Sequence, residues 1–409
     1  MRLLMRRYRN IPDFTWRVRG GSPEFPGAAG VVSVRRMPHP SHEKQKQRNA
    51  FFDNAKYLAI VLVAVAHAWE PVMDGSRTTR ALYMVVYTFH MPAFVIVSGY
   101  FSRSFAGRPD QMRRLVSGVL VPYAVFEAAY SLLRRWAGGE PEHPLSLTDP
   151  FYLTWFLAAL FVWRLTVPLW RALRHPLPVA VAVAAAASCA PGVGADLDLQ
   201  RVLQFLPFFV LGLVLREEHV LLLRRPAVRA AAVPVVLVAV AVAYAVAPRL
   251  RLGWFFRTSA AQELDAPWWS GPVMTLALGG CALVLTAAFL AWVPERRLWC
   301  TALGAGSVCG YLLHGFPLKA LEYGGAVEAY PVLASPAGRI ALTAAAAAVV
   351  TLLCTGPVRR ALRCVTEPRL AWAFRPAPPP AVPDPRPAGP AGAGRAPGAA
   401  PAPAAVSRR

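Results

Sequence analysis

Long apolar runs, separated by short polar connections, follow one another from about residue 55 to about residue 358. A helix needs about 20 mostly apolar residues to cross a bilayer, and most of these runs approach that length. We therefore predict an all-α, polytopic membrane protein with about ten transmembrane helices. The predicted helices cover residues 55–73, 81–102, 115–135, 150–170, 176–191, 200–216, 227–248, 272–293, 299–319 and 335–358.

Polar sequence flanks this region on both sides. The first 50 residues are Arg-rich and lack the apolar segment of a cleaved signal peptide, so we expect the first span to act as an uncleaved anchor. The C-terminal residues are rich in Pro and Ala without a period, a composition that buries too little apolar surface to fold. The predicted organisation is a disordered basic tail (1–50), a transmembrane domain (51–360) and a disordered tail (361–409).

Composition supports the membrane prediction, since 56% of the residues are hydrophobic and only 16% are charged, against about one quarter charged in soluble proteins. The net charge of +22 raises the alternative of a nucleic-acid-binding protein. Such proteins carry their basic residues on one face, interleaved with aromatics, whereas here they lie in tails and short connections, as the positive-inside rule predicts. We expect no nucleic-acid partner, a multi-pass protein of the cell membrane, and an N-in/C-in orientation.

Ionisable residues within the apolar runs are functional candidates, because a charge near the bilayer centre costs a few kcal/mol or more. The cysteines show no CxxC or metal-ligand spacing, so we expect no metal site. Six ionisable residues stand out: His67, Glu70, His90, Glu127, Arg164 and His314.

The first span carries two of these residues and a lysine. Lys56 and His67 are eleven residues apart, which is about 20° beyond three full helical turns and a rise of about 16.5 Å. Both side chains therefore face one side, with Lys56 at the cytoplasmic interface. Glu70 follows His67 at i+3, close enough for contact. Lys56 alone is typical of a snorkelling anchor and His67 alone of a structural histidine, but together they indicate a polar track leading inward.

The second span combines a histidine with a helix breaker. Pro92 follows His90 closely, and a proline inside a helix predicts a bend or break. Near the cytoplasmic end of the same span lie Ser98, Gly99 and Tyr100. Small residues at that place allow either close helix packing or the approach of a ligand to the backbone.

Arginines crowd the cytoplasmic loop after the second span: Arg103, Arg108, Arg113 and Arg114. Membrane topology explains them as well as an anion site does, although arginine suits phosphate where such a site exists. Arg164, near the cytoplasmic end of the fourth span, leaves the same choice between snorkelling and an anion contact.

The ninth span places Ser307, Tyr311 and His314 on one helical face. The longest external loop, residues 249–271, is rich in Trp and Phe. These rings fit an aromatic interface belt or a stacking surface for a sugar.

Five stretches of the chain together resemble the acyltransferase-3 family of integral-membrane acyltransferases, over about residues 48–358. Within the family, the fucose 4-O-acetylase-like branch is the most similar. In order, the stretches are RNAFFDNAKYLAIVLVAVAHA, TFHMPAFVIVSGYF, MRRLVSGVLVPY, LTWFLAALFVWRL and SVCGYLLHGFPL.

The resemblance implies transfer of an acyl group, commonly acetyl, from a cytoplasmic donor such as acetyl-CoA to a hydroxyl of a glycan or glycosylated small molecule. The family motif of a basic residue, ten residues and a histidine matches Lys56 and His67, with lysine where many members have arginine. Lysine keeps the charge but lacks the planar fork of arginine.

A sugar hydroxyl needs a base within hydrogen-bond reach, a role that suits His67, with Glu70 orienting the imidazole. The expected donor-phosphate ligands are Lys56, Arg103, Arg113 and Arg114. The expected acceptor-site residues are His90, Ser98, Tyr100, Tyr311 and His314.

A transporter or flippase for a glycan or lipid-linked sugar is the alternative, because its intramembrane His and Glu would relay protons. Such transporters are commonly built from internal repeats, and residues 55–217 and 227–358 show none. A non-catalytic membrane sensor is a third possibility that the sequence leaves open.

Overall fold

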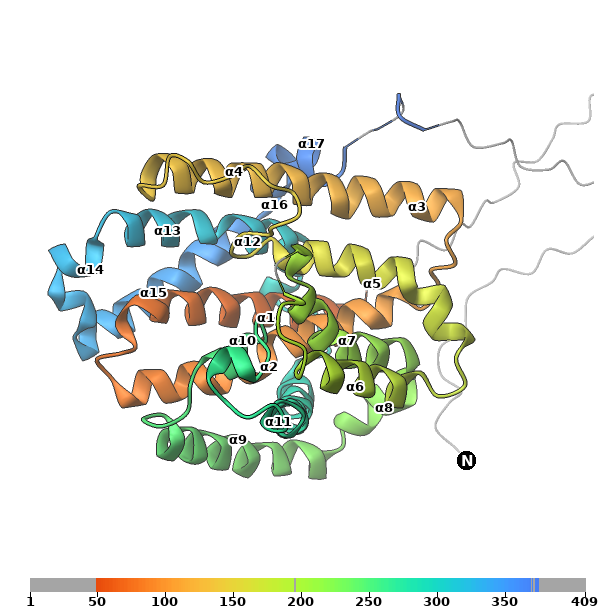
Figure 1. Ribbon diagram of the computed structural model, residues 1–409, viewed down its shortest axis with the longest axis horizontal. Coiled ribbons are helices and arrows are strands. Elements are labelled where there is room, and N and C mark those ends of the chain that lie inside the picture. Colours follow the sequence, from red (N-terminus) through yellow and green to blue (C-terminus); the bar gives the residue numbers. More distant parts are fainter. Residues whose placement is uncertain (1–48, 195, 369, 371, 375–409) are drawn as a thin grey trace, which may run out of the picture. The chain divides into compact units, whose positions relative to one another are not determined.

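A computed structural model describes residues 49–194, 196–368, 370 and 372–374, and the regular elements among them are all helical (Figure 1). The predicted all-α class is confirmed. The predicted N-terminal tail and most of the C-terminal tail lie outside the described residues, although α17 extends helix into the predicted C-terminal tail. The elements are α1 (Ala50–Trp69), η1 (Glu70–Val72), α2 (Arg77–Ser102), α3 (Pro109–Leu115), η2 (Val116–Leu120), α4 (Val121–Ala137), α5 (Trp155–Ala172), α6 (Pro176–Ala187), η3 (Asp196–Asp198), α7 (Leu199–Val214), α8 (Glu217–Leu223), α9 (Pro226–Val246), α10 (Gly253–Phe256), η4 (Gln262–Leu264), α11 (Ser270–Trp292), η5 (Trp299–Gly306), α12 (Ser307–Leu313), α13 (Gly315–Tyr323), α14 (Ala326–Ala329), η6 (Pro331–Ala334), α15 (Pro336–Leu353), α16 (Gly356–Ala361) and α17 (Arg363–Thr366).

All ten predicted spans are helical, and within the described residues seven helical segments are long and apolar enough to cross a membrane. Three predicted spans have no counterpart among these seven segments, each for its own reason. α6 has only 12 residues, α5 carries Arg164 and Arg171 within its 18, and the predicted ninth span is divided into η5, α12 and α13. The seven segments are Ala50–Val72, Arg77–Ser102, Pro109–Ala137, Asp196–Val214, Pro226–Val246, Ser270–Trp292 and Pro336–Leu353.

Burial separates inner helices from outer ones. α1 and α2 are mostly buried, while α9 and α15 leave most of their apolar side chains exposed, as expected for helices that face lipid. Figure 1 accordingly shows α1 and α2 surrounded by other helices and α9 at the periphery. A functional site within the helical unit should therefore be built around α1 and α2.

Two glycines bring α2 and α7 into backbone contact. A Cβ added to Gly99 would lie 2.1 Å from the Phe209 carbonyl oxygen, and one added to Gly212 would lie 2.2 Å from that of Ile96. Of the two roles open to Gly99, helix packing is therefore the one observed. α2 also continues as one helix through Pro92, so the predicted break is not found there.

Candidate active site

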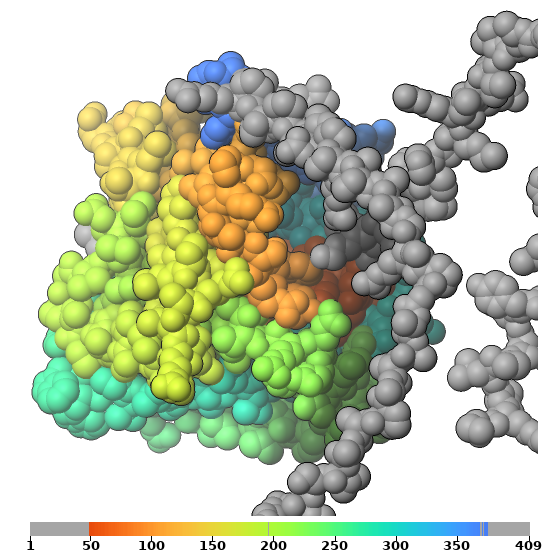
Figure 2. All heavy atoms as spheres, turned by 90° about the vertical axis from the view of Figure 1, so that its right-hand side faces the viewer, coloured from red at the N-terminus to blue at the C-terminus, as the bar shows by residue number. Residues whose placement is uncertain are grey.

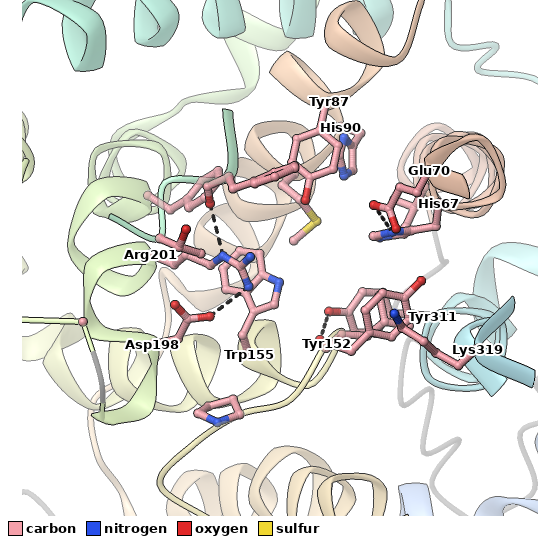
Figure 3. Close-up of a pocket in the computed structure, with 18 of the residues that line it drawn as sticks. His67, Glu70, Tyr87, His90, Tyr152, Trp155, Asp198, Arg201, Tyr311 and Lys319 are labelled. Atoms are coloured by element: carbon pink, nitrogen blue, oxygen red, sulfur yellow. Dashed lines mark hydrogen bonds and ion pairs between the residues drawn. The ribbon is translucent and has the colours of Figure 1, made fainter. Parts of the chain in front are cut away.

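A cavity of about 530 Å³ lies beside the C-terminal end of α1 (Figure 3). Its walls come from helices far apart in the sequence and combine aromatic rings with titratable groups. The lining residues are Val63, His67, Glu70, Tyr87, His90, Met91, Asp149, Pro150, Tyr152, Leu153, Trp155, Gly194, Asp198, Arg201, Phe205, Phe256, Thr258, Tyr311 and Lys319. Concave sites of this size with a few polar groups among apolar walls are typical of small-molecule binding.

His67 and Glu70 form a hydrogen-bonded pair on one side of this cavity. Glu70 opens the 3-10 turn η1, and its backbone N–H still donates to the His67 carbonyl. The side-chain Oε1 of Glu70 lies 2.9 Å from Nδ1 of His67, and the hydroxyl of Tyr83 donates to the same oxygen at 3.1 Å. The contact that the i+3 spacing predicts is therefore present. Because a carboxylate accepts hydrogen bonds, Nδ1 carries the imidazole proton and Nε2 of the neutral ring keeps its lone pair.

Two further histidines lie close to this pair. Nδ1 of His90 is 2.9 Å from the Val86 carbonyl, and Nδ1 of His314 is 2.9 Å from the Gly310 carbonyl. A carbonyl only accepts, so both rings carry their proton on Nδ1. His90 lines the cavity, whereas His314 lies behind it, with its ring centroid 5.7 Å from that of His67. Nε2 of His314 is buried and has no hydrogen-bond partner among the described residues.

An arginine and an aspartate that the sequence did not single out lie across the cavity from His67 (Figure 3). Nη1 of Arg201 lies 2.8 Å from the Asp198 carboxylate, and its Nε donates to the Phe256 carbonyl at 3.1 Å. The guanidinium carbon is 5.0 Å from the ring centroid of Trp155. This wall therefore presents a guanidinium held in place by two acceptors and an aromatic ring.

Lys319 is a second cation that the sequence reasoning missed. Its Nζ lies 2.7 Å from the Glu322 carboxylate and 4.5 Å from the ring centroid of Tyr152. Arg201 and Lys319 both lie near the end of a predicted span. Their only signal was a charge at a helix end, which snorkelling anchors also produce.

Tyr152 contacts His67 from the segment before α5, with the two ring centroids 5.1 Å apart. Its φ of 57° lies in the left-handed region, which is uncommon for a residue with a side chain. The buried carboxylate of Glu127 contacts the chain on both sides of Tyr152, since it accepts from the Phe151 N–H at 2.9 Å and from the Thr154 hydroxyl. Glu127 thus fixes the backbone that presents Tyr152 to the imidazole.

The predicted acceptor-site residues divide into two groups. His90 and Tyr311 line the cavity, and the Tyr311 hydroxyl donates to the Leu153 carbonyl. Ser98 and Tyr100 do not line it. They lie eight and ten residues after His90 on α2, about 12 and 15 Å further along the helix, so the cavity is beyond their reach.

None of the four predicted phosphate ligands lines this cavity. Lys56 is near the opposite end of α1, and its Nζ lies 2.8 Å from the Asp53 carboxylate. Arg103 donates to the carbonyls of Tyr100 (3.0 Å) and Leu215 (2.9 Å). These contacts hold both cations at the end of the helical unit remote from His67.

The remaining predicted cations belong to α3, after the α2–α3 connection that faces the viewer in orange in Figure 2. Arg114 pairs with Asp110, and the Arg113 guanidinium carbon lies 5.3 Å from the Phe374 ring centroid. Arg164 of α5 donates to the Ser102 hydroxyl at 3.1 Å. The two alternatives for Arg164 were snorkelling and an anion contact, and among the described residues the structure shows neither; it shows a contact between α5 and α2.

The aromatic residues of the 249–271 loop lie in two different environments. Phe256 lines the cavity, whereas Trp268 and Trp269 are 63% and 57% exposed. Phe256 is thus placed where it can contact a ligand, whereas Trp268 and Trp269 are not among the cavity-lining residues. Next to Phe256, burial lowers the pKa of Arg257 to about 10, so its guanidinium stays protonated at neutral pH.

Among the described residues, no group of three or more His, Cys, Asp or Glu side chains could hold a metal ion. All six cysteines are free thiols. The polar groups that line the cavity are imidazoles, carboxylates, hydroxyls and two cations.

Comparison with known proteins gives one match. The family model described as an acyltransferase domain, that of the acyltransferase-3 family, matches residues 49–356. No curated protein and no solved structure matches the chain. The matched range contains every residue of the cavity wall.

Proposed function

The chain belongs to the acyltransferase-3 family and is therefore a membrane acyltransferase, and we propose that it transfers an acetyl group from cytoplasmic acetyl-CoA to a hydroxyl of a glycan or glycosylated small molecule. In this proposal His67 is the general base and Glu70 orients its imidazole. The fucose 4-O-acetylase-like branch is part of the same proposal. We also propose that the protein is located in the cell membrane.

One observation carries the proposal: the Nδ1 proton of His67 is engaged by Glu70 at the edge of a 530 Å³ cavity. The carboxylate fixes the tautomer, so the lone pair of Nε2 is available to accept the proton of a bound hydroxyl. Histidine suits this role because its ordinary pKa lies near neutral pH. The pair therefore supplies what a sugar hydroxyl lacks, a base within hydrogen-bond reach.

The reaction balances without a further reagent. Nε2 of His67 takes the acceptor hydroxyl proton while the oxygen attacks the thioester carbonyl carbon. The new C–O bond forms, the C–S bond breaks, and the imidazolium returns its proton to the CoA thiolate. Glu70 stabilises the imidazolium between these two proton transfers.

The acceptor in this proposal is an uncharged, hydroxylated ring. The cations of the cavity wall are already paired, Arg201 with Asp198 and Lys319 with Glu322. An anionic acceptor would have to displace those carboxylates, whereas hydroxyls hydrogen-bond to the paired groups without breaking the pairs. Trp155 and Phe256 add aromatic faces to the same wall, on which the apolar face of a sugar ring packs.

The donor's phosphates belong, in this proposal, with Lys56, Arg103, Arg113 and Arg114, although phosphate must displace the carboxylates on Lys56 and Arg114 and the carbonyls on Arg103. Lys56 precedes His67 by about 16.5 Å of helix. The donor's thioester therefore has to extend from that end of α1 toward His67.

Incubation of the detergent-purified protein with labelled acetyl-CoA and a panel of methyl glycosides tests the proposal. We expect labelled acetyl esters to form together with stoichiometric free CoA thiol. Family membership favours this outcome over the transporter alternative. The proposal fails if folded protein forms no ester and releases no CoA with any glycoside of a broad panel. That result would support the transporter alternative.

A further inference from the structure

A second, smaller cavity of about 70 Å³ meets the imidazole of His67. His67 and Tyr152 line both cavities, so the two spaces adjoin at the same pair of rings. Unlike the larger cavity, the smaller one has mainly aliphatic walls. Among its other lining residues are Ala68, Pro71, Leu318, Glu322, Glu328 and Leu342.

The smaller cavity lies beyond His67 along α1 as seen from Lys56. Ala68 and Pro71 follow His67 in the chain, whereas Lys56 precedes it by eleven residues. A donor held by its phosphates near Lys56 carries its acyl group at the far tip of the thioester arm. When the thioester carbonyl reaches His67, the alkyl part of the acyl group therefore points toward the side on which this cavity lies.

We propose that the smaller cavity binds the alkyl part of the donor's acyl group and limits its length. This inference rests on the proposed function. In transfer, the acceptor oxygen must be bonded to His67 and lie within about 3–3.5 Å of the acyl carbon. The hydroxylated acceptor fits the larger, polar cavity, which leaves the adjoining apolar cavity for the acyl chain.

The chemistry of the walls supports an uncharged alkyl chain as the occupant. Leu318 packs with Ala68 in a small hydrophobic cluster at the inner part of the cavity. Glu322 and Glu328 are exposed, so they lie at its rim. Carboxylates there disfavour an acyl group that ends in a second carboxylate, because like charges repel.

The size of the cavity sets the chain length. About 10–15 Å³ corresponds to one water-sized position, so 70 Å³ offers about five such positions. Acetyl, propionyl and butyryl groups fit this space, whereas an octanoyl group exceeds it. The protein should therefore use short acyl donors and reject medium-length ones.

The test compares acetyl-CoA, butyryl-CoA and octanoyl-CoA with the methyl glycoside that accepts acetyl, using kcat/KM for each donor. Leu342→Ala widens the cavity, and we expect it to raise the octanoyl-to-acetyl ratio by about tenfold or more, since each methylene in a pocket changes kcat/KM by about 10- to 200-fold. Leu352→Ala on the same helix, α15, is the matched control. Its side chain is 65% exposed and lines neither cavity.

Ala68→Val narrows the cavity and should lower the butyryl-to-acetyl ratio. Size-exclusion chromatography of each variant establishes that it is folded. If Ala68→Val does not fold, Leu342→Ala alone tests the inference. If Leu342→Ala transfers acetyl with the same donor preference as Leu352→Ala, the acyl-site inference is overturned and the proposed function stands. If wild-type protein transfers no acyl group from any of the three donors, the proposed function itself fails.

Discussion

Glu70 should act on catalysis only through His67, and a double-mutant cycle measures this dependence. Glu70→Gln keeps the shape of the side chain but replaces the acceptor of the Nδ1 proton, which lies 2.9 Å away, by an uncharged amide. The imidazolium formed in the reaction then loses its counter-charge, so the loss appears in kcat.

The size of this loss follows from the contact. A hydrogen bond to a charged group contributes about 1.5–3 kcal/mol, and each 1.36 kcal/mol in the barrier is about tenfold in rate. The side chain of Glu70 is 29% exposed, so solvent screens part of the interaction. We therefore expect Glu70→Gln to lower kcat by about 10- to 50-fold. His67→Ala removes the base itself and should lower kcat by about 10²- to 10⁴-fold.

The assay is the initial rate of labelled acetyl transfer to a methyl glycoside, normalised to the amount of folded protein. In the His67→Ala background there is no imidazole for Glu70 to orient, so Glu70→Gln should have almost no further effect. The reasoning is refuted if Glu70→Gln lowers kcat by the same factor in the presence and absence of His67.

Two other predictions concern the framework of the site. Gly99→Ala would place a Cβ 2.1 Å from the Phe209 carbonyl oxygen, so it should lower the free energy of unfolding by about 1–3 kcal/mol. Thermal unfolding in detergent checks this against Gly279→Ala, which has open space around its Cβ, and equal melting temperatures would contradict it. Glu127→Ala leaves the Phe151 N–H without its acceptor and the Thr154 hydroxyl with only the Phe151 carbonyl, and should cost about 1–3 kcal/mol. Glu127→Gln keeps one acceptor oxygen and should cost less, so an equal loss in both variants would argue against the hydrogen-bonding role.

The helical architecture could be predicted from the sequence because a membrane span must satisfy its backbone hydrogen bonds internally. Run length alone therefore identifies helices such as α9 and α11. It says less about α6 and the α12–α13 pair, since tertiary packing allows short or interrupted helices inside a bundle.

The candidate site could be predicted only where polarity conflicts with an apolar setting. His67 and His90 stand out on that ground, helical spacing links Glu70 to His67, and a face shared with His314 singles out Tyr311. Ser98 shares α2 with His90, but the direction of a helix face does not reveal how far along the helix a cavity extends.

Other site residues depend on tertiary structure. Arg201 and Lys319 lie near helix ends, where snorkelling anchors also place cations. Tyr152 contacts His67 from a segment whose backbone is hydrogen-bonded to Glu127 of another helix. No periodicity in the sequence reports such a contact.

The most direct test of the central claim is the profile of acetylated glycans and glycosylated metabolites in a strain that lacks this protein. The account predicts that at least one molecule loses an acetyl ester in that strain. The wild-type protein should restore the ester, and an equally abundant His67→Gln variant should not. An unchanged profile in the deletion strain, or full restoration by His67→Gln, would contradict it.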